Sequence, residues 1–447
     1  MNPDRPDIPL RVAIRVWLKI GLINFGGPAG QIALMHRLLV EERRWISEAR
    51  FLHALNYCML LPGPEAQQLA TYIGWLMHRT VGGLVAGTLF ILPGFVLMLL
   101  IGAAYVSWGE LQWMQGLLLG MQAATLAIVV QAVVRLGART LRHGALYALA
   151  AVAFTAIFAF DVPFPLIVLG AAALGILGTR LVPRAFAPPG EEGVLATADP
   201  LPETAVPPPT WTLRVLLSGV LLWGLPVLLL LASLGASHVY TQQALFFSKM
   251  AVVTFGGAYA VLAYMTQQAV ERYGWLSPTE MVQGLALAET TPGPLILVLT
   301  YVGFLAAYRE PGALDPLLAG VLGGSLSTWI TFVPCFLWIF LGAPYVERLR
   351  GHRALSAALT GITAAVVGVI LNLSVWFALH VWFAQIAERP VYGVNLPLPL
   401  WSTADPVAIT LSAMAMLALL PLRAGLMWVL AGSAGLGLVA SLLGWTA

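Results

Sequence analysis

Long apolar runs dominate the chain, and their lengths predict helices that cross a membrane. A helix needs roughly 20 residues to span the hydrocarbon core of a bilayer. No water is present there to satisfy an open sheet edge, so such runs are expected to be helical. Two further runs, near the lower length limit, predict a tight hairpin of short spans. The clear spans are Val81–Tyr105, Val215–Leu234, Ala319–Leu341 and Ala424–Leu443, and the short pair is Gly144–Phe160 and Phe164–Gly178.

The composition agrees with an all-α integral membrane protein. Of 447 residues, 59% are hydrophobic and 10% are charged, whereas a soluble domain carries about 25% charged residues. The formal net charge of +3 is spread over loops, so no nucleic acid is expected as a partner. Cys58 and Cys335 lie in apolar runs without a CxxC pair and are interpreted as small buried residues. The polar start, Met1–Pro9, does not resemble a cleavable signal peptide.

A proline-rich, acidic stretch divides the chain near its middle, and the two sides match. The run from Lys19 to Gly27 recurs 230 residues later as Lys249 to Gly257, and Pro62-Gly-Pro64 recurs as Pro292-Gly-Pro294 at the same shift. An insertion around Glu310–Pro316 accounts for a larger shift further on. We therefore expect two copies of one unit. The predicted parts are an N-terminal repeat at 1–182, a proline-rich cytoplasmic linker at 183–210, a connecting transmembrane helix at 211–239 and a C-terminal repeat at 240–447.

Arginine placement predicts that the two repeats have opposite orientations in the membrane. Loops rich in Arg and Lys stay in the cytoplasm. Segment 36–50 holds four arginines where its counterpart 266–280 holds one, whereas segment 343–353 holds three and its counterpart 106–112 none. Basic loops thus change places between the repeats. This indicates inverted-topology repeats, with the extra crossing supplied by Val215–Leu234 and a binding site expected at the repeat interface.

Each repeat contains two points at which a helix should break. Proline removes a backbone donor, and glycine accepts left-handed conformations. A break at membrane depth is tolerated where it is packed in protein or lines a cavity, and a helix that restarts there offers free N–H groups and a positive dipole end to an anion. Broken or re-entrant helices are therefore expected at Gly26-Gly27, Pro62-Gly63-Pro64, Gly256-Gly257 and Pro292-Gly293-Pro294. Kinks that serve packing alone are the alternative reading.

Polar side chains near these breaks complete the expected oxyanion site. Lys19 and Lys249 precede the two Phe-Gly pairs in apolar surroundings, and an ammonium would supply a point charge with three donors; snorkelling to headgroups is the alternative. Uncharged donors also cluster there, although each could instead join helices. The uncharged candidates are Asn24, Gln31, Gln67, Gln68, Thr71, Tyr72, Thr254, Thr290, Thr291, Thr300 and Tyr301, together with the backbone of Phe25.

Glu65 and Glu289 are candidates for carrying a coupling proton. Glu65 directly follows one Pro-Gly-Pro, and Glu289 lies shortly before the other. Intramembrane acids are functional hypotheses by default. They do not occupy equivalent repeat positions, and an ionised acid would repel a dianion.

The motifs in order resemble those of the chromate ion transporter family, of the long-chain ChrA type. They are Asn24-Phe-Gly-Gly-Pro28, Glu41-Glu-Arg-Arg-Trp45, Leu61-Pro-Gly-Pro64, Tyr72-Ile-Gly74 and Ile91-Leu-Pro93, and the resemblance extends over both halves. It implies a multi-pass protein of the bacterial inner membrane that exports chromate and confers chromate resistance, with antiparallel halves.

Two positions depart from an even duplication, because Ala258 replaces Pro28 and Leu295 replaces Glu65 in the second copy. The halves are therefore not expected to contribute equally. Sulfate shares the shape and charge of chromate, so sulfate or another oxyanion stays open as the cargo. A channel mechanism and assembly as a homodimer also stay open. An intramembrane enzyme is disfavoured because no HExxH or paired membrane aspartates occur. Membrane lipid is the expected surrounding, and neither a cofactor nor a metal is expected.

Overall fold

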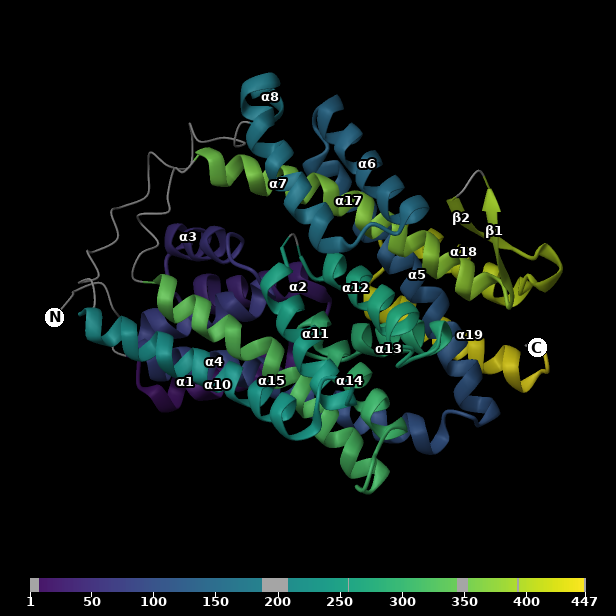
Figure 1. Cartoon of the computed structure of the whole chain (residues 1–447), viewed down its shortest axis with the longest axis horizontal. Helices are drawn as coiled ribbons and strands as arrows, with labels where there is room; N and C mark the ends of the chain where they lie inside the picture. Colours follow the sequence, from purple (N-terminus) through teal and green to yellow (C-terminus); the bar gives the residue numbers. More distant parts are fainter. Residues whose placement is uncertain (1–7, 187–207, 256, 344–352, 392–393, 446–447) are drawn as a thin grey trace. The chain divides into compact units, whose positions relative to one another are not determined.

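The computed structural model describes residues 8–186, 208–255, 257–343, 353–391 and 394–445. Helices dominate this part of the chain (Figure 1). The chain forms two compact units, and each unit draws segments from both halves of the sequence. Unit 1 comprises Met1–Gly102, Pro189–Ala258 and Thr291–His352, and unit 2 comprises Ala103–Pro188, Tyr259–Thr290 and Arg353–Ala447.

The first half contributes α1 (Leu10–Ile23), α2 (Gly27–His36), the π-helical turn η1 (Arg37–Glu42), α3 (Glu48–Cys58), α4 (Glu65–Trp108), α5 (Gln112–Thr140), α6 (Gly144–Phe160), α7 (Phe164–Leu181) and the short α8 (Pro183–Phe186). The second half contributes α11 (Val239–Val253), α12 (Ala258–Thr266), the π-helical turn η2 (Gln267–Arg272), α13 (Pro278–Thr290), η3 (Leu295–Leu297), α14 (Val298–Arg309), α15 (Pro316–Gly342), α17 (Arg353–Trp382), α18 (Pro406–Leu419) and α19 (Leu426–Leu442). Between the halves stands α10 (Pro209–Leu234).

Six helices among the described residues are long and apolar enough to cross a membrane, which confirms the all-α membrane class. They are Glu65–Trp108, Gln112–Thr140, Phe164–Leu181, Pro209–Leu234, Pro316–Gly342 and Ala354–Trp382. The predicted spans lie within these helices, except for two shorter apolar helices. Gly144–Phe160 has the predicted bounds, and the last apolar run forms Leu426–Leu442. Most of the predicted linker lies outside the described residues, although Pro183–Phe186 forms α8 and Pro209 begins α10.

The duplication seen in the sequence extends to individual turns of the backbone. The π-helical turns η1 and η2 lie at the same repeat positions. After each of them the chain closes in the same way, because Trp45 N–H donates to Leu39 O at 2.8 Å and Trp275 N–H donates to Ala269 O at 2.8 Å. These bonds give Trp45 and Trp275 of the repeated motif a common structural role.

A sharp break divides α4, and the longer connection at the same place in the second repeat accounts for the change in the shift between equivalent residues. Its backbone leaves helical geometry at His78 and Arg79, so Glu65–Met77 corresponds to α14 and the part from Thr80 onwards corresponds to α15. In the second half the same connection is longer, since α14 ends at Arg309 and α15 begins at Pro316 after an Asp315 side-chain cap. The insertion predicted around 310–316 therefore falls in a loop.

Small residues allow two helical segments to pack closely in each repeat. These segments are the two parts of α4 in the first repeat and α14 with α15 in the second. A Cβ built on Gly74 would lie 2.4 Å from Gly82 O, and one built on Gly323 would lie 2.4 Å from Gly303 O. Both contacts are within unit 1. A side chain at any of these positions would force the helices apart. The two segments therefore form a closely packed helical pair in each repeat.

Unit 2 is built by helices of each repeat packing on helices of the other. A Cβ built on Gly437 of α19 would lie 2.4 Å from Gly116 O of α5, and one built on Gly175 of α7 would lie 2.3 Å from Ala357 O of α17. Because α5 corresponds to α17 and α7 to α19, these two contacts are equivalent. Each repeat therefore packs on the other through the same pair of elements.

A β-hairpin follows α17 and was not predicted. Strands β1 (Ile386–Val391) and β2 (Val394–Pro399) pair antiparallel, with Ile386 opposite Pro399 and Val391 opposite Val394. It occupies the connection between α17 and α18, which is longer than the equivalent connection between α5 and α6. A sequence reading that searches for long apolar runs does not register such short strands.

Candidate functional site

Unit 1 contains the four predicted helix breaks. In the first repeat, α1 ends at Ile23 before α2 begins at Gly27, and α3 ends at Cys58 before α4 begins at Glu65. In the second repeat, α11 ends at Val253 and η3 begins at Leu295. No helix continues through residues 62–64 or 292–294. Gly256 lies outside the described residues, so this break is described through Thr254 and Gly257.

The breaks are joined crosswise between the repeats by two equivalent hydrogen bonds. Gly63 N–H donates to Thr254 O at 2.9 Å, and Gly293 N–H donates to Asn24 O at 3.4 Å. Each Pro-Gly-Pro of one repeat therefore contacts the interrupted helix end of the other. Backbone groups exposed by a break need partners when water is absent, and these bonds supply part of that need.

Glycine is required at the centre of both Pro-Gly-Pro segments. Gly63 has φ +126° and Gly293 has φ +110°, a region that L side chains rarely adopt. A neighbouring helix also lies against each glycine. A Cβ on Gly63 would lie 2.9 Å from Cys335 Sγ, and one on Gly293 would lie 3.4 Å from Gly94 Cα. Cys335 and Gly94 occupy matching positions in α15 and α4.

Asn24 and Gln31 organise the crossing near Gly293. Gln31 Nε2 donates to Asn24 O at 3.1 Å and also to Gly293 O, and Asn24 Nδ2 donates to Phe90 O at 3.4 Å. Both side chains are buried. Asn24 Oδ1 and Gln31 Oε1 have no hydrogen-bond partner among the described residues. This crossing therefore holds buried amide oxygens in addition to its backbone contacts.

Gln67 and Gln68 lie at the start of α4, beside the other crossing. Gln68 Nε2 donates to Pro62 O at 2.7 Å, and Gln67 Nε2 donates to Thr71 Oγ1 at 3.0 Å. Both glutamines are 0% exposed, and the described residues offer no partner to either Oε1. Both glutamines are among the uncharged candidates that the sequence predicted.

The second repeat contributes fewer open polar groups. Thr254 donates its hydroxyl to Met250 O in its own helix, and Thr300 Oγ1 lies 2.7 Å from Thr328 Oγ1. Thr291 Oγ1 lies 3.7 Å from Met98 Sδ. Where the first repeat has Gln31, the second has the buried Val261. The polar lining of the breaks is thus supplied unequally, as Ala258 and Leu295 led us to expect.

The remaining break residues are placed as follows. Pro64 and the whole of 291–294 are buried, Pro62, Phe25 and Gly27 are half-buried, and Gly26 is exposed. In unit 2, Thr290 donates its hydroxyl to Leu287 O at 2.7 Å. Tyr72 and Tyr301 are buried in unit 1.

Lys19 and Lys249 are not brought into this cluster. Each lies on an exposed face of its helix, whereas the adjacent Ile20 and Met250 are buried. The cluster at the crossings is therefore formed by backbone groups and uncharged amides rather than by lysines.

The two acids lie in different units. Glu65 is half-buried in unit 1, and its Oε1 would lie 4.0 Å from a Cβ built on Gly257, the residue before α12. Glu289 is buried in unit 2, where Tyr259 Oη donates to its Oε1 at 2.9 Å. Tyr259 was not selected from the sequence, since a single tyrosine in an apolar helix carries no distinctive pattern.

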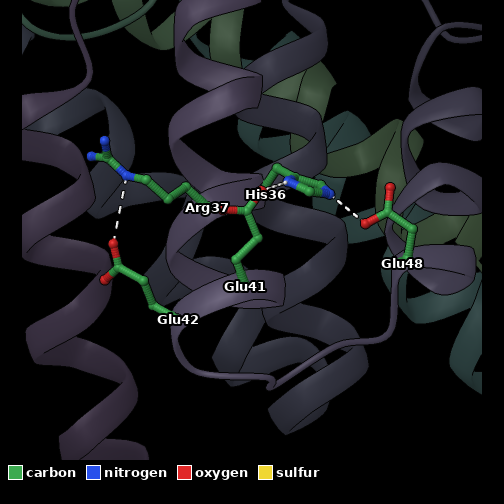
Figure 2. A network of polar contacts seen from close by, with 5 residues as sticks. All are labelled: His36, Arg37, Glu41, Glu42 and Glu48. Carbon is green, nitrogen blue, oxygen red and sulfur yellow. Dashed lines mark hydrogen bonds and ion pairs between the residues drawn. The ribbon is translucent and has the colours of Figure 1, made fainter.

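A polar network holds the loop of the first-repeat hairpin formed by α2, η1 and α3. Figure 2 shows the His36 ring between two carboxylates, with Nδ1 3.1 Å from Glu41 Oε1 and Nε2 in contact with Glu48 Oε2. Arg37 Nε lies 3.6 Å from Glu42 Oε1. The second repeat has Thr266 at the position of His36, so this network is a feature of the first hairpin.

The fold defines a multi-pass helical membrane protein whose two repeats interlock at broken helices. The profile of the Chromate transporter family matches residues 12–176 and again residues 241–438, once in each repeat. The chain belongs to the chromate transporter family, and its two fused repeats fit the long-chain type.

Relatives named for chromate transport agree with this assignment over most of their length. The chain is 31% identical to the chromate transport protein of Cupriavidus metallidurans, over 82% of this chain and 82% of that protein. It is 33% identical to the chromate transport protein of Pseudomonas aeruginosa, over 79% and 77% respectively. It is 28% identical to a probable chromate transport protein of Synechococcus elongatus, over 82% and 84%. No solved structure matches the chain.

Proposed function

We propose that this protein is a secondary transporter that exports chromate across the bacterial inner membrane and thereby confers chromate resistance. Membership of the family and the names of two relatives, which are chromate transport proteins, support chromate as the cargo. The structural observation that carries the proposal is the pair of equivalent bonds from Gly63 to Thr254 and from Gly293 to Asn24. They gather helix ends into one buried region of unit 1.

This region has the chemistry that an oxyanion needs. At the start of α4, the N–H groups of Glu65, Ala66 and Gln67 have no acceptor within the helix. The reason is that no helical residue precedes the first turn to supply carbonyl oxygens. Such N–H groups and the positive end of the helix dipole stabilise an anion. We assign the substrate to the crossing formed by Pro62-Gly63-Pro64 and Thr254, where buried amides of the first repeat surround the helix start.

Opposite orientation of the repeats is part of the proposal. The exchange of arginine-rich loops between equivalent positions supports it, and the reciprocal contacts within each unit agree with a two-fold relation between repeats. Inverted repeats with a site at their interface are an arrangement used for alternating access.

Coupling is assigned to the two acids. Glu289, with Tyr259 as its hydrogen-bond donor, is a carboxyl group isolated from water and paired with a group that stabilises its ionised form. Glu65 adjoins the substrate crossing, so its ionised form would repel the anion and uptake of a proton would relieve that repulsion. Either acid would link proton transfer to anion movement.

Transport in inside-out membrane vesicles tests the proposal. Vesicles that contain the protein should accumulate radiolabelled chromate above its external concentration when a proton gradient is applied, and cells that express it should tolerate more chromate. Vesicles that contain the Gly63→Ala variant should not accumulate it. Accumulation in right-side-out vesicles alone would contradict export, and equilibration without accumulation would contradict secondary transport in favour of a channel.

A further inference from the structure

Helix α1 carries a row of basic side chains on the face that it leaves exposed. Arg11, Arg15 and Lys19 follow one another at intervals of four residues, and side chains at that spacing lie one above the other on the same face of a helix. All three residues are exposed. At a rise of 1.5 Å per residue, the row extends about 12 Å along the helix. These three residues are called the α1 stripe below.

The opposite face of α1 fixes the helix to the rest of unit 1. Its buried residues join a hydrophobic cluster that also contains residues of α3, α4 and α15. Trp17 is 1% exposed and Ile20 is 0% exposed, so this face is fully packed. The α1 stripe therefore faces away from the protein.

Apolar side chains border the α1 stripe on both sides. Val12, Ile14, Leu18 and Leu22 are between 36% and 52% exposed. A helix face made for water does not place such side chains among its cations, whereas a lipid surface accommodates both kinds. Acyl chains contact the apolar residues, and long basic side chains reach the headgroups.

The α1 stripe begins at an end of unit 1 that adjoins the membrane surface. His78 Nε2 lies 2.7 Å from Ile8 O, just before α1, and His78 marks the break within α4. The equivalent connection of the second repeat is the exposed, irregular loop 310–315, and such loops do not lie in the hydrocarbon region. Helical side chains tilt toward the N-terminus of their helix, which directs the stripe toward the headgroups.

No carboxylate balances the α1 stripe among the described residues. Helix α1 contains no Asp or Glu, and the ion pairs of the described part of the chain involve other cations. In the second repeat the positions of the two arginines are occupied by Thr241 and Leu245, so the stripe belongs to the first repeat. A row of uncompensated cations between apolar side chains is complementary to anionic headgroups.

We propose that the α1 stripe binds the headgroups of anionic phospholipids. Their phosphate oxygens accept hydrogen bonds from the two guanidinium groups and the ammonium, while the bordering apolar residues contact the acyl chains. Helix α1 ends at Ile23, next to the break at which Asn24 O accepts from Gly293 N–H at 3.4 Å. A lipid that holds α1 therefore also holds one partner of this crossing. The inference goes beyond the proposed function, because it concerns lipid recognition and not the transported anion.

Thermal unfolding of the full-length protein in a neutral detergent tests lipid binding directly. A ligand that binds the folded state raises the unfolding temperature, so phosphatidylglycerol should raise it more than phosphatidylcholine does. The triple variant Arg11→Gln/Arg15→Gln/Lys19→Gln, called the stripe variant, should lose most of this difference. The reason is that each basic group near an anionic surface contributes about fivefold in affinity. An equal response of the stripe variant and the wild type would overturn the inference.

Three arginines of the first hairpin provide the matched control. Arg37, Arg43 and Arg44 are also exposed residues of unit 1, but the carboxylates of Glu41 and Glu42 lie among them in the chain. Replacing all three arginines by glutamine removes the same charge and should leave the response to phosphatidylglycerol close to that of the wild type. An equal loss in both triple variants would contradict a specific role for the α1 stripe.

Transport in liposomes separates lipid from substrate as the anion that the α1 stripe recognises. In phosphatidylcholine alone, the stripe variant and the wild type should have the same KM for chromate. A higher KM for the variant in these neutral liposomes would assign the stripe to attraction of the transported anion and overturn the inference.

Adding phosphatidylglycerol to the liposomes should raise the transport rate of the wild type more than that of the stripe variant. An equal increase would contradict the link between lipid on α1 and the crossing at its end. Absence of transport in every liposome would instead reject the proposed function, and the unfolding measurement would still decide whether the stripe binds anionic lipid.

Discussion

Gly63 and Thr254 are joined by a 2.9 Å hydrogen bond from the backbone N–H of one to the backbone oxygen of the other. The bond links a proline-flanked turn of the first repeat to an interrupted helix end of the second, and Gly293 and Asn24 form its equivalent. A helix broken at membrane depth exposes backbone groups that need partners. Here each repeat supplies those partners to the other, so the breaks are mutually dependent.

Replacing Gly63 by alanine should abolish transport and lower the stability of the protein. The φ of +126° is strained for alanine, at a cost of about 1–3 kcal/mol, and the new methyl group would meet Gln68 Nε2 at 2.7 Å and Cys335 Sγ at 2.9 Å. Thermal unfolding in detergent and vesicle flux measure both effects. Gly432→Ala is the control, because nothing lies within 4 Å of a Cβ built there; equal behaviour of the two variants would show that the break is not constrained.

Gln31→Val should destabilise the crossing near Gly293. Valine is the residue at the equivalent position of the second repeat, Val261, but here it would leave the oxygens of Asn24 and Gly293 without the amide that bridges them. The expected loss is about 1–3 kcal/mol in the free energy of unfolding.

Gln242→Leu is the comparison for that measurement. Its amide donates to Ser237 O at an exposed position, where the loss should stay within about 0.5 kcal/mol. A Gln31→Val protein as stable as the wild type would mean that the bridge contributes nothing to the crossing.

Single cysteines at the two hairpin loops should be labelled from opposite sides of the membrane. Arg43 and Tyr273 occupy equivalent repeat positions after η1 and η2, so inverted repeats put them on different faces. Cys58 and Cys335, the chain's two cysteines, are first replaced by alanine. An impermeant maleimide applied to sealed, oriented vesicles should then react with Tyr273→Cys on one side and Arg43→Cys on the other. Reaction of both from the same side would establish parallel repeats.

The His36 network should stabilise the first hairpin. The two ring nitrogens face carboxylate oxygens, those of Glu41 and Glu48. The exposed carboxylates limit the contribution to no more than about 1 kcal/mol. His36→Gln removes the ring that contacts both carboxylates and should therefore lower the unfolding temperature in detergent.

Arg37→Gln serves as the control for that comparison. Its partner Glu42 is exposed and 3.6 Å away, so any loss should be smaller than that caused by His36→Gln. A His36→Gln protein that unfolds at the wild-type temperature would mean that the network does not stabilise the hairpin.

Several features of the fold follow from local patterns in the chain. The lengths of the apolar runs predict the spanning helices, because the bilayer sets a minimum length and requires internal backbone hydrogen bonds. Proline next to glycine predicts the breaks at 62–64 and 292–294, and the constant shift of 230 residues predicts the duplication. These inferences depend on neighbouring residues alone. The β-hairpin Ile386–Pro399 was not predicted from these patterns, because its strands are short and lie in the connection between two helices.

What the sequence by itself determined is therefore the class of protein, the repeats and the positions at which helices stop. The tertiary structure alone decided which ends meet, because the bond from Gly63 to Thr254 joins residues whose proximity no local pattern encodes. It also decided that Lys19 and Lys249 lie on exposed faces, whereas the amides of Gln31 and Gln68 turn inward to the breaks. The reason is that hydrogen bonding and burial depend on the partners that packing brings within reach, and those partners come from the opposite repeat or a distant turn.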